Sequence, residues 1–428
     1  MSYNTLNAHK LLESKSWGNI PLDAFAYLLS RFLKERNIES KQWIVLPKEE
    51  DLLGFKEQLQ FWGHSKEHIC IYPANDPDSL QGLSPTRSIP QERILSLQQW
   101  YQNPKTIIIS SVFGLMHKRI SQKDLTSLSL KFKVENEYKI KDLLSSLQNM
   151  GYFYESEVNE AGTFHHHGDS IRIWGIGDEH PVRLSFFDTE LEAIHKFVGK
   201  ERQSLKEITL LPAREIVINA QTTKKLSSHL IQRVKETGKG RSLRRRILHD
   251  FDHGLWFPGA EEYLPALLEL EDIQQSLILI KPEDSKVALE YWSNKIGNRW
   301  ELYKEEQRPL INTTARFSNK AHCLSLFNNA WSIEPELSGE TLFDLEKTKT
   351  YRSTQQSIEQ LLKWVNRWQR QDYLIIFVAQ TDNRLQRLEH ILKFHDISAQ
   401  KISNVTDAKS GQISLTQGYL EEGFIDHT

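Results

Sequence analysis

The hydrophobic positions of this 428-residue chain follow two different patterns. Near both ends, continuous apolar runs such as WIVL, TIIISSVF and SLILI alternate with amphipathic stretches. Buried parallel strands have such continuous runs, and helices connect one strand to the next. The middle of the chain instead alternates apolar and polar residues with a period of two, as strands with one solvated face do. The pattern therefore predicts an α/β multidomain protein that contains both kinds of sheet.

Residues 1–119 carry the first α/β pattern. Apolar residues at helical spacing run through 22–36, and a more polar helix is expected from Lys48 to about Trp62. Strands are expected at 43–46, 69–72 and 106–113, and a helix containing ERILSLQQWY precedes the last of them. Strands that alternate with helices in this way build a parallel sheet. We therefore expect a parallel-sheet domain over residues 1–119.

Residues 120–211 predict a domain with an antiparallel sheet. A strand around 130–134 and a helix over 141–150 precede short strands bounded by glycine, aspartate and proline. In the stretch VRLSFF, the residues that alternate with the apolar ones include Arg183 and Phe187, which therefore share the solvated face. An arginine beside an exposed aromatic side chain is typical of a protein-binding hot spot. Ordinary scatter of surface residues gives the same pattern.

Residues 212–272 return to helical sequence and carry a basic cluster, KGRSLRRRILHD. On a helix, Arg241, Arg244 and Arg245 share one face, and such a face can contact the phosphates of a nucleic acid. A solvated helix whose arginines pair with acids such as Asp250 has the same sequence. Both interpretations stay open at this point.

Residues 273–428 show a second α/β pattern, and we expect a separate domain there. SLILI at 276–280 and YLIIFV at 373–378 are predicted to be buried strands, each followed by helical sequence. QISLTQGYLEEGF predicts a strand and then a loop. Residues 330–360 are polar and have little periodicity, so a loop is expected between the strands.

Composition excludes several classes of protein. The 54 basic and 56 acidic residues nearly balance, so the chain as a whole has no strong attraction for nucleic acid or for an acidic membrane. Two cysteines, Cys70 and Cys323, lie far apart and indicate a reducing compartment. The N-terminus lacks the apolar core of a signal peptide, and no apolar run approaches membrane length. We expect a cytoplasmic protein with no membrane partner.

The sequence predicts no nucleotide cofactor. A phosphate-binding loop needs glycines, whose backbone N–H groups surround the phosphates, and a lysine that reaches them. At the corresponding place, residues 17–23 read WGNIPLD, with one glycine and no Lys-Ser/Thr pair. Pro21 removes a backbone donor and Asp23 would repel phosphate. The GK pair at 238–239 lacks the upstream glycine. We therefore expect no ATP binding in the P-loop manner.

Two further motifs suggest a helicase or a metal site, but their surroundings do not support either function. Residues 178–180, DEH, are similar to a helicase acidic box, but glycine and proline residues around them predict a turn. Residues 165–167, HHH, are consecutive, so they cannot all face one ion, and no Cys or carboxylate spacing supports a site. We expect no metal and no catalytic residues.

Three ordered motifs carry a family resemblance. They are GTF-x-x-x-G-D-x-I-x-I from Gly162, P-x-R-L-x-F-F-D-x-E-L-E-x-I from Pro181, and I-x-L-L-P-A-x-E from Ile208. Together they resemble the second domain of the UvrB-like module, which occurs in the repair helicase UvrB and in bacterial transcription-repair coupling factors (Mfd). GLWFPGAEEYLPALLE at 254–269 resembles a segment of the coupling factors, and the chain ends in a related motif, GYLEEGF, followed by IDHT.

The resemblance covers essentially the whole chain and implies its organisation. It implies a degenerate P-loop-type (RecA-like) parallel-sheet domain, an inserted antiparallel α+β UvrB-like domain, a returning segment at 212–272 that completes the first domain, and a separate C-terminal α/β domain. The missing phosphate loop and the short turn at 75–88 favour a coupling factor, because UvrB carries a long aromatic hairpin at that place.

The resemblance also implies a partner, the damage-recognition ATPase UvrA. The arginine and the last phenylalanine of the family's R-L-x-F-F strand match Arg183 and Phe187, whereas a second arginine of the preceding strand is replaced by His167. Arginine carries a permanent charge and binds bidentately, while histidine is charged mainly at acidic pH. Contact through His167 is therefore expected to be weakened or to depend on pH. RNA polymerase and DNA are implied as partners only through further domains of the family.

Our leading hypothesis is a non-catalytic adaptor that recruits UvrA and restrains the ATP-dependent motor of a longer coupling factor. The first alternative is an active UvrB-like helicase, which requires a phosphate loop. The second is a DNA-binding module acting through residues 241–246, which predicts steeply salt-dependent affinity for DNA.

Overall fold

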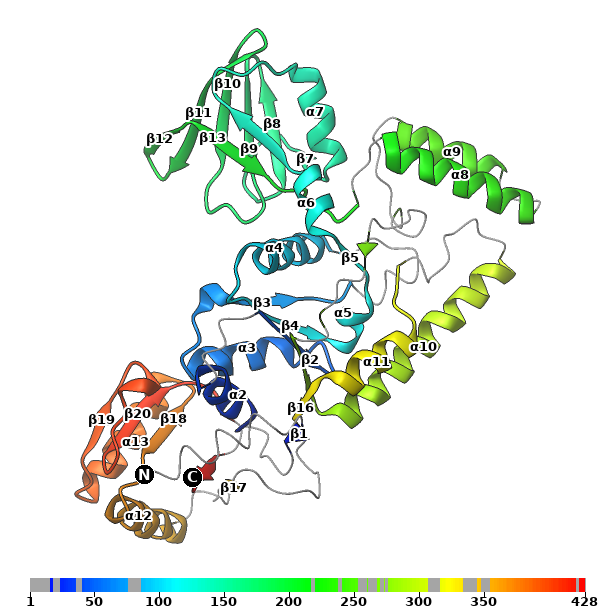
Figure 1. Ribbon diagram of the computed structural model, residues 1–428. Coiled ribbons are helices and arrows are strands. Elements are labelled where there is room, and N and C mark those ends of the chain that lie inside the picture. Colours follow the sequence, from blue (N-terminus) through cyan, green and yellow to red (C-terminus); the bar gives the residue numbers. More distant parts are fainter. Residues whose placement is uncertain are drawn as a thin grey trace.

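The computed structural model (Figure 1) describes most of the chain. The described residues are 16–17, 24–35, 41–75, 86–216, 220–237, 241–252, 260, 268–269, 273, 276–306, 316–333, 345–347, 355–420 and 423–427. They form a parallel-sheet unit, an antiparallel unit over residues 130–210, a pair of helices, and a C-terminal unit over residues 355–427. The protein is thus a mixed α/β protein, as the sequence predicts.

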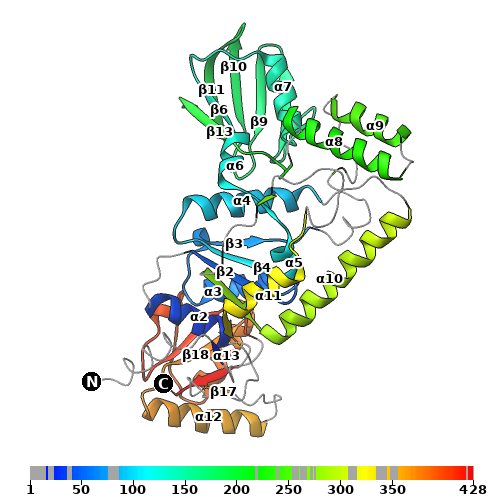
Figure 2. The same ribbon diagram turned by 45° about the vertical axis from the view of Figure 1, so that its right-hand side comes forward.

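The parallel-sheet unit is built on six parallel strands. In spatial order they are β1 (Ser16–Trp17), β16 (Trp331–Ile333), β15 (Leu277–Ile280), β2 (Gln42–Leu46), β4 (Ile107–Ser111) and β3 (Ile69–Tyr72). Its helices are α2 (Ala24–Glu35), α3 (Leu52–Phe61), α4 (Ser88–Gln102), α5 (Val112–Met116), α10 (Pro282–Glu305) and α11 (Lys320–Asn329). In the two views, α2 and α3 lie on one side of the sheet and α4 on the other (Figures 1 and 2).

Helices cover both faces of this sheet because its strands are apolar on both sides. Trp43 and Val45 of β2 point into the core formed with α4, α5, α10 and α11. Ile44 and Leu46 of the same strand point into the core formed with α2 and α3. Continuous apolar runs therefore correctly predict parallel strands here.

Two sequence predictions about this unit are wrong. The expected boundary at residue 273 separates β15 from the first sheet, but β15 pairs with β2, and β16 pairs with β15 in turn. The loop expected at 330–360 likewise contains β16, the short strand β17 (Leu345–Lys347) and the start of a helix. These strands are short, and their partners are remote in sequence, so local periodicity carries no signal for the pairing.

The strand expected at 106–113 ends earlier, at Ser111. The Ser111 hydroxyl accepts a hydrogen bond of 3.0 Å from the backbone N–H of Gly114 and so caps helix α5. Lys281, directly after β15, has a φ of 50°, and Pro282 then begins the long helix α10. α10 confirms the helical sequence expected after this strand and continues to Glu305.

The antiparallel unit lies in sequence between strands of the first sheet and stands apart from that sheet at the top of the view (Figure 1). It follows β5 (Arg119–Ile120) and α6 (Gln122–Leu128). Its elements are β6 (Leu130–Lys133), α7 (Ile140–Asn149), β7 (Phe153–Tyr154), β8 (Thr163–His167), β9 (Ser170–Trp174), β10 (Val182–Phe187), β11 (Glu190–Val198), β12 (Glu201–Leu205) and β13 (Glu207–Leu210). The main sheet has the order β12-β11-β10-β9-β8-β7, and β13 pairs separately with β6. The predicted strand at 130–134 and helix at 141–150 are confirmed.

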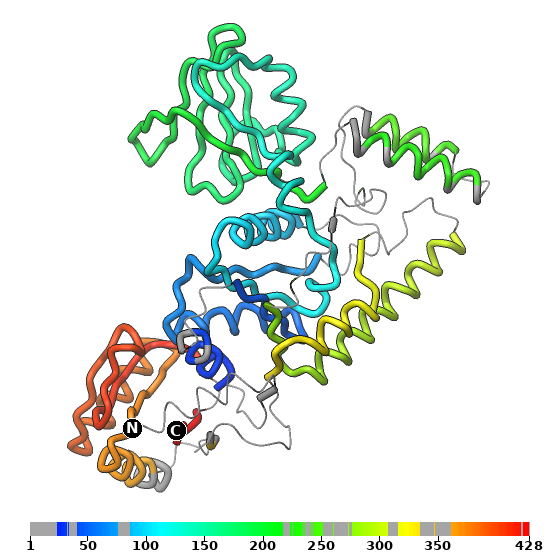
Figure 3. The backbone as a smooth tube through the Cα atoms, viewed as in Figure 1, coloured from blue at the N-terminus to red at the C-terminus, as the bar shows by residue number. Residues whose placement is uncertain are grey.

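Residues 220–252 form two helices, α8 (Ala220–Thr237) and α9 (Arg241–Asp252), which lie side by side (Figures 2 and 3). The helical character expected for this region is confirmed. Further along the chain, β14 (Leu268–Glu269) pairs with β5. The family-like segment at 254–269 and the GK pair at 238–239 lie largely outside the described residues, as do 18–23 of the expected degenerate loop and most of the turn at 75–88.

The C-terminal unit has a small parallel sheet of the order β18-β20-β19. Its elements are α12 (Gln355–Arg370), β18 (Ile375–Ala379), α13 (Asp382–Phe394), β19 (Ala399–Lys401) and β20 (Ile413–Gln417). It has its own hydrophobic core. The strands expected near 373–378 and from 412 are confirmed, and β21 (Phe424–Asp426), which pairs with β17, begins at the last residue of the stretch where a loop was expected.

The residues after β20 pack against α2 and α3 of the parallel-sheet unit. Tyr27 donates a 2.7 Å hydrogen bond to the Asp426 carboxylate, and Arg31 lies 3.1 Å from the same oxygen. Phe424 lies 5.2 Å from Tyr27, centroid to centroid. A Cβ atom at Gly418 would come within 2.6 Å of the Phe61 ring, so this contact requires glycine.

A buried ion pair ties residue 215, just after the antiparallel unit, to α4. The Arg93 side chain is fully buried, and its Nε lies 2.9 Å from the Glu215 carboxylate. Its Nη1 donates 2.7 Å to the carbonyl oxygen of Pro73, and its Nη2 donates to the Tyr72 hydroxyl. The guanidinium also lies 4.1 Å from the centre of the Tyr72 ring. The buried charge is therefore paired and hydrogen-bonded, as a buried charge requires.

His117, a buried residue at the end of α5, gives the fold a predicted acid sensitivity. Burial, followed by the nearby Arg93, holds the pKa of His117 well below its ordinary value of 6.5, although its Nδ1 lies 2.8 Å from the Phe113 carbonyl oxygen. As the pH falls below 6.5, the unfolded chain therefore binds a proton at His117, whereas the folded chain does not. Stability is present above pH 6.5 and is lost as pH falls below it, by up to about 1.4 kcal/mol per pH unit.

Urea titrations check this prediction. They compare the free energy of unfolding of the wild type and of His117→Leu at several pH values between about 7 and 5. The variant should lose less stability over this range. Equal pH slopes for the two proteins would show that His117 does not contribute.

Candidate protein-binding face of the antiparallel sheet

The solvated face of the antiparallel sheet positions two of the predicted binding residues. Along β10, Val182, Leu184 and Phe186 are buried, whereas Arg183 and Phe187 are exposed. The irregularity between β10 and β11 places the extra residue on β11, so the alternation of β10 is kept as far as Phe187. Arg183 and Phe187 therefore share one face, as the sequence predicts.

Phe187 is presented by a tight hairpin turn. It pairs with Glu190, and Asp188 between them has a φ of 55°, a left-handed conformation that aspartate tolerates in turns. The Phe187 side chain is 69% exposed. A large ring that is mostly exposed next to a turn buries little surface in the fold and can enter a pocket on a partner.

His167 lies on the same face at the end of β8. It is exposed and pairs with Ser170 across a turn in which Gly168 has a φ of 56°. Ser170 in turn pairs with Ser185, between Arg183 and Phe187. The structure thus brings all three predicted residues onto one face.

The strand register adds residues that the sequence analysis did not assign to the site. Arg172 of β9 lies directly opposite Arg183, and His195 of β11 lies opposite it on the other side. Arg172 and Arg202 also lie 5.7 and 5.9 Å from the centre of the Phe197 ring. The alternation of Ile171 and Ile173 with Arg172 and Trp174 indicates the face of Arg172, but only the register shows that it faces Arg183.

The three arginines of the basic cluster on α9 differ in their exposure to solvent. Arg241 and Arg245 are exposed, whereas Arg244 is half-buried. The Nε atom of Arg244 is buried without a hydrogen-bond partner among the described residues. The three side chains therefore do not form one fully solvated face.

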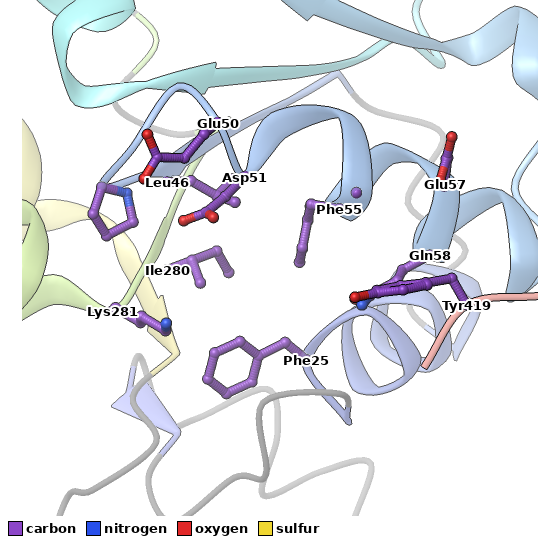
Figure 4. Close-up of a pocket in the computed structure, with 12 residues that line it drawn as sticks. Phe25, Leu46, Glu50, Asp51, Phe55, Glu57, Gln58, Ile280, Lys281 and Tyr419 are labelled. Atoms are coloured by element: carbon purple, nitrogen blue, oxygen red, sulfur yellow. The ribbon is translucent and has the colours of Figure 1, made fainter. Parts of the chain in front are cut away.

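A cavity of about 390 Å³ opens at the carboxyl ends of β2 and β15 (Figure 4), where open parallel sheets place their ligand sites. Phe25, Phe55, Leu46 and Ile280 supply its apolar lining. The carboxylates of Glu50, Asp51 and Glu57 and the ammonium of Lys281 supply its charged groups, with Tyr419 at one side. With three carboxylates against one ammonium, the charged part of the lining is net acidic.

The described residues contain no group of three or more His, Cys, Asp or Glu side chains arranged to hold a metal ion. Asp178 lies in the loop between β9 and β10, in agreement with the predicted turn. Within the same described residues, none of the helices combines the length and the apolar character needed to cross a bilayer. Cys70 and Cys323 are free thiols.

Two parts of the chain match known protein families. Residues 130–216, which contain the antiparallel unit, match the UvrB interaction domain. Residues 369–428, which lie in the C-terminal unit, match the D3 domain of MFD. The antiparallel unit thus belongs to the class of UvrB interaction domains, and the C-terminal unit to that of MFD D3 domains.

Whole-chain comparisons lead to a particular kind of protein. The chain is 21% identical to the transcription-repair-coupling factor of Bacillus subtilis over 83% of its own length, and 22% identical to that of Staphylococcus haemolyticus over 86%. It is 22% identical to that of Haemophilus influenzae over 98%. The matched parts are 32%, 33% and 37% of these relatives, so the chain spans about a third of their length. The resemblance to transcription-repair coupling factors is confirmed.

Proposed function

We propose that this chain is the non-catalytic, UvrA-recruiting part of a transcription-repair coupling factor. The observation that carries the proposal is the exposed Arg183 and Phe187 face on the segment that matches the UvrB interaction domain. The relatives' name supports a role in coupling transcription to DNA repair. In this function the chain brings UvrA to a stalled RNA polymerase for transcription-coupled nucleotide excision repair.

The other units have a supporting role in this proposal. The parallel-sheet unit is a RecA-like domain that has lost its nucleotide site, and the antiparallel unit is inserted into it. The parallel-sheet unit and the C-terminal unit together restrain the ATP-dependent DNA translocase motor of the longer protein. RNA polymerase and DNA are partners of that longer protein, which acts in the cytoplasm.

The acidic cavity supports this reading against an active helicase. A helicase needs groups that hold the phosphates of ATP and its magnesium ion. Glu50, Asp51 and Glu57 would instead repel those phosphates. A DNA-binding role for α9 is less well supported, because Arg244 is partly withdrawn from solvent.

Calorimetric titration of UvrA into the purified chain tests the proposal, with ATP and a DNA duplex titrated in parallel. We expect saturable binding of UvrA, no heat from ATP, and little binding of the duplex. ATP binding would favour the helicase. Duplex affinity that falls steeply with salt would favour the DNA-binding module. If UvrA fails to bind at both pH 6 and pH 8, the recruitment role is wrong.

A further inference from the structure

Arg172 and Arg183 form an uncompensated pair of like charges. They are direct cross-strand neighbours on the solvated face, and such neighbours have Cβ atoms about 4.5–5.5 Å apart. Like charges in this position destabilise a sheet. In the part of the chain that the structure describes, neither arginine forms an ion pair with a carboxylate. The isolated fold therefore gains nothing from placing them opposite each other.

Two histidines flank the arginine pair in the same row of the sheet. His165 lies opposite Arg172 on one side of the pair, and His195 lies opposite Arg183 on the other. Beyond His195 the neighbour is Ser204, so on that side the row contains no carboxylate. Arg202 follows in the next row, with its guanidinium beside the same Phe197 ring that Arg172 approaches. Contact with an aromatic ring holds an arginine side chain in place while leaving its charge available.

Three exposed acids lie at the other end of the face. Asp188, Glu190 and Glu192 are exposed in or beside the hairpin turn that presents Phe187. A nucleic-acid strand that crossed the face would bring its phosphates close to these carboxylates. A protein surface can instead place carboxylates against the arginines and an apolar pocket against Phe187.

We propose that Arg172, paired with Arg183, binds carboxylates on the protein partner that this face recruits. Arg172 is thus a second, permanently charged specificity residue of the site, and the binding surface reaches from Phe187 across β9, β10 and β11 to Arg202. This inference rests on the proposed recruitment of UvrA and adds to it the acidic character of the partner's surface.

The test compares UvrA binding by the wild type, Arg172→Gln and Arg387→Gln. Arg387 is an exposed arginine on α13 of the C-terminal unit, so the control removes the same charge far from the face. We expect Arg172→Gln to weaken binding about tenfold at about 0.1 M salt, with a smaller difference at about 0.5 M. Arg387→Gln should bind like the wild type. Since a like-charge repulsion is removed, the melting temperature of Arg172→Gln should stay the same or rise.

The outcomes separate this inference from the proposed function. If the wild type does not bind UvrA, the recruitment role itself is wrong. If the wild type binds and Arg172→Gln binds equally well, recruitment stands and the role of Arg172 is wrong. If a fluorescent single-stranded DNA binds the wild type and loses affinity in Arg172→Gln, the face recognises phosphates rather than an acidic protein surface.

Discussion

Replacing Glu215 with alanine is expected to lower the free energy of unfolding by about 3–5 kcal/mol, because it leaves the buried Arg93 charge without its counterion. The guanidinium is fully buried and lies 2.9 Å from the carboxylate. The Glu49 carboxylate also attracts this charge, but the other direct partners of the guanidinium, the Pro73 carbonyl and the Tyr72 hydroxyl and ring, are uncharged. They cannot offset the cost of desolvating a full positive charge.

This ion pair also fixes the chain where it leaves the antiparallel unit. Glu215 follows β13 by only a few residues, and the Ala213 backbone N–H donates 2.8 Å to the Met150 carbonyl. The Tyr152 hydroxyl donates 2.9 Å to the Leu211 carbonyl. Loss of Glu215 should therefore loosen the attachment of the antiparallel unit as well as the core around α4.

Urea unfolding of the wild type, Glu215→Ala and Glu160→Ala measures the effect. Glu160 is the matched control, because it forms a 3.1 Å ion pair with Arg87 in which both side chains are largely exposed. Such surface pairs contribute about 0–1 kcal/mol. Similar losses in the two variants would contradict the importance of burial at Arg93. The double variant Arg93→Met with Glu215→Leu should recover much of the loss, since it removes both charges together.

The environment of Arg93 illustrates what the sequence does not reveal. In the stretch ERILSLQQWY, Arg93 stands beside Glu92 and has the composition of a solvated helix face. Its burial depends on Glu215, more than a hundred residues away, and on the arrival of Tyr72 from β3. A local pattern reports which residues are apolar, but the pairing of a buried charge is decided by contacts that are remote in the sequence.

For the same reason, the sequence does not show which strands belong to the first parallel sheet. The run at 277–280 correctly predicts a buried strand, yet nothing in its residues distinguishes a strand of a new domain from one that joins β2. The strand at 331–333 is too short to show any periodicity. The existence of the strand at 277–280 was therefore predictable from the sequence, whereas the strand at 331–333, the sheet membership of both strands and the boundary at 273 were not.

The binding face was more accessible to sequence reasoning because a period of two directly assigns residues to opposite sides of a strand. That rule places Arg183 and Phe187 on one side of β10. It does not supply the register between strands, which determines that Arg172 faces Arg183 and that His167 lies opposite Ser170. The individual residues of the site were predictable, whereas their neighbours across the sheet required the structure.

The neighbouring phenylalanines of β10 give the sharpest test of the face. Phe187→Ala should weaken UvrA binding by about 2 kcal/mol or more, roughly thirtyfold, if the exposed ring fills a pocket on the partner. Its melting temperature should change little, because the ring is 69% exposed. Phe186→Ala is the matched control: Phe186 is 4% exposed and faces the core, so its loss should cost about 3–5 kcal/mol of stability.

The two variants remove the same atoms from adjacent positions of one strand. They therefore differ only in the face of the sheet from which the ring is removed. Calorimetric titration with UvrA and thermal unfolding are measured on both. A Phe187→Ala protein that melts as early as Phe186→Ala would show that the ring supports the fold. Unchanged UvrA affinity in a stable Phe187→Ala protein would place the contact elsewhere on the sheet. A loss of affinity without a loss of stability is expected only if this ring is held in solvent for a partner.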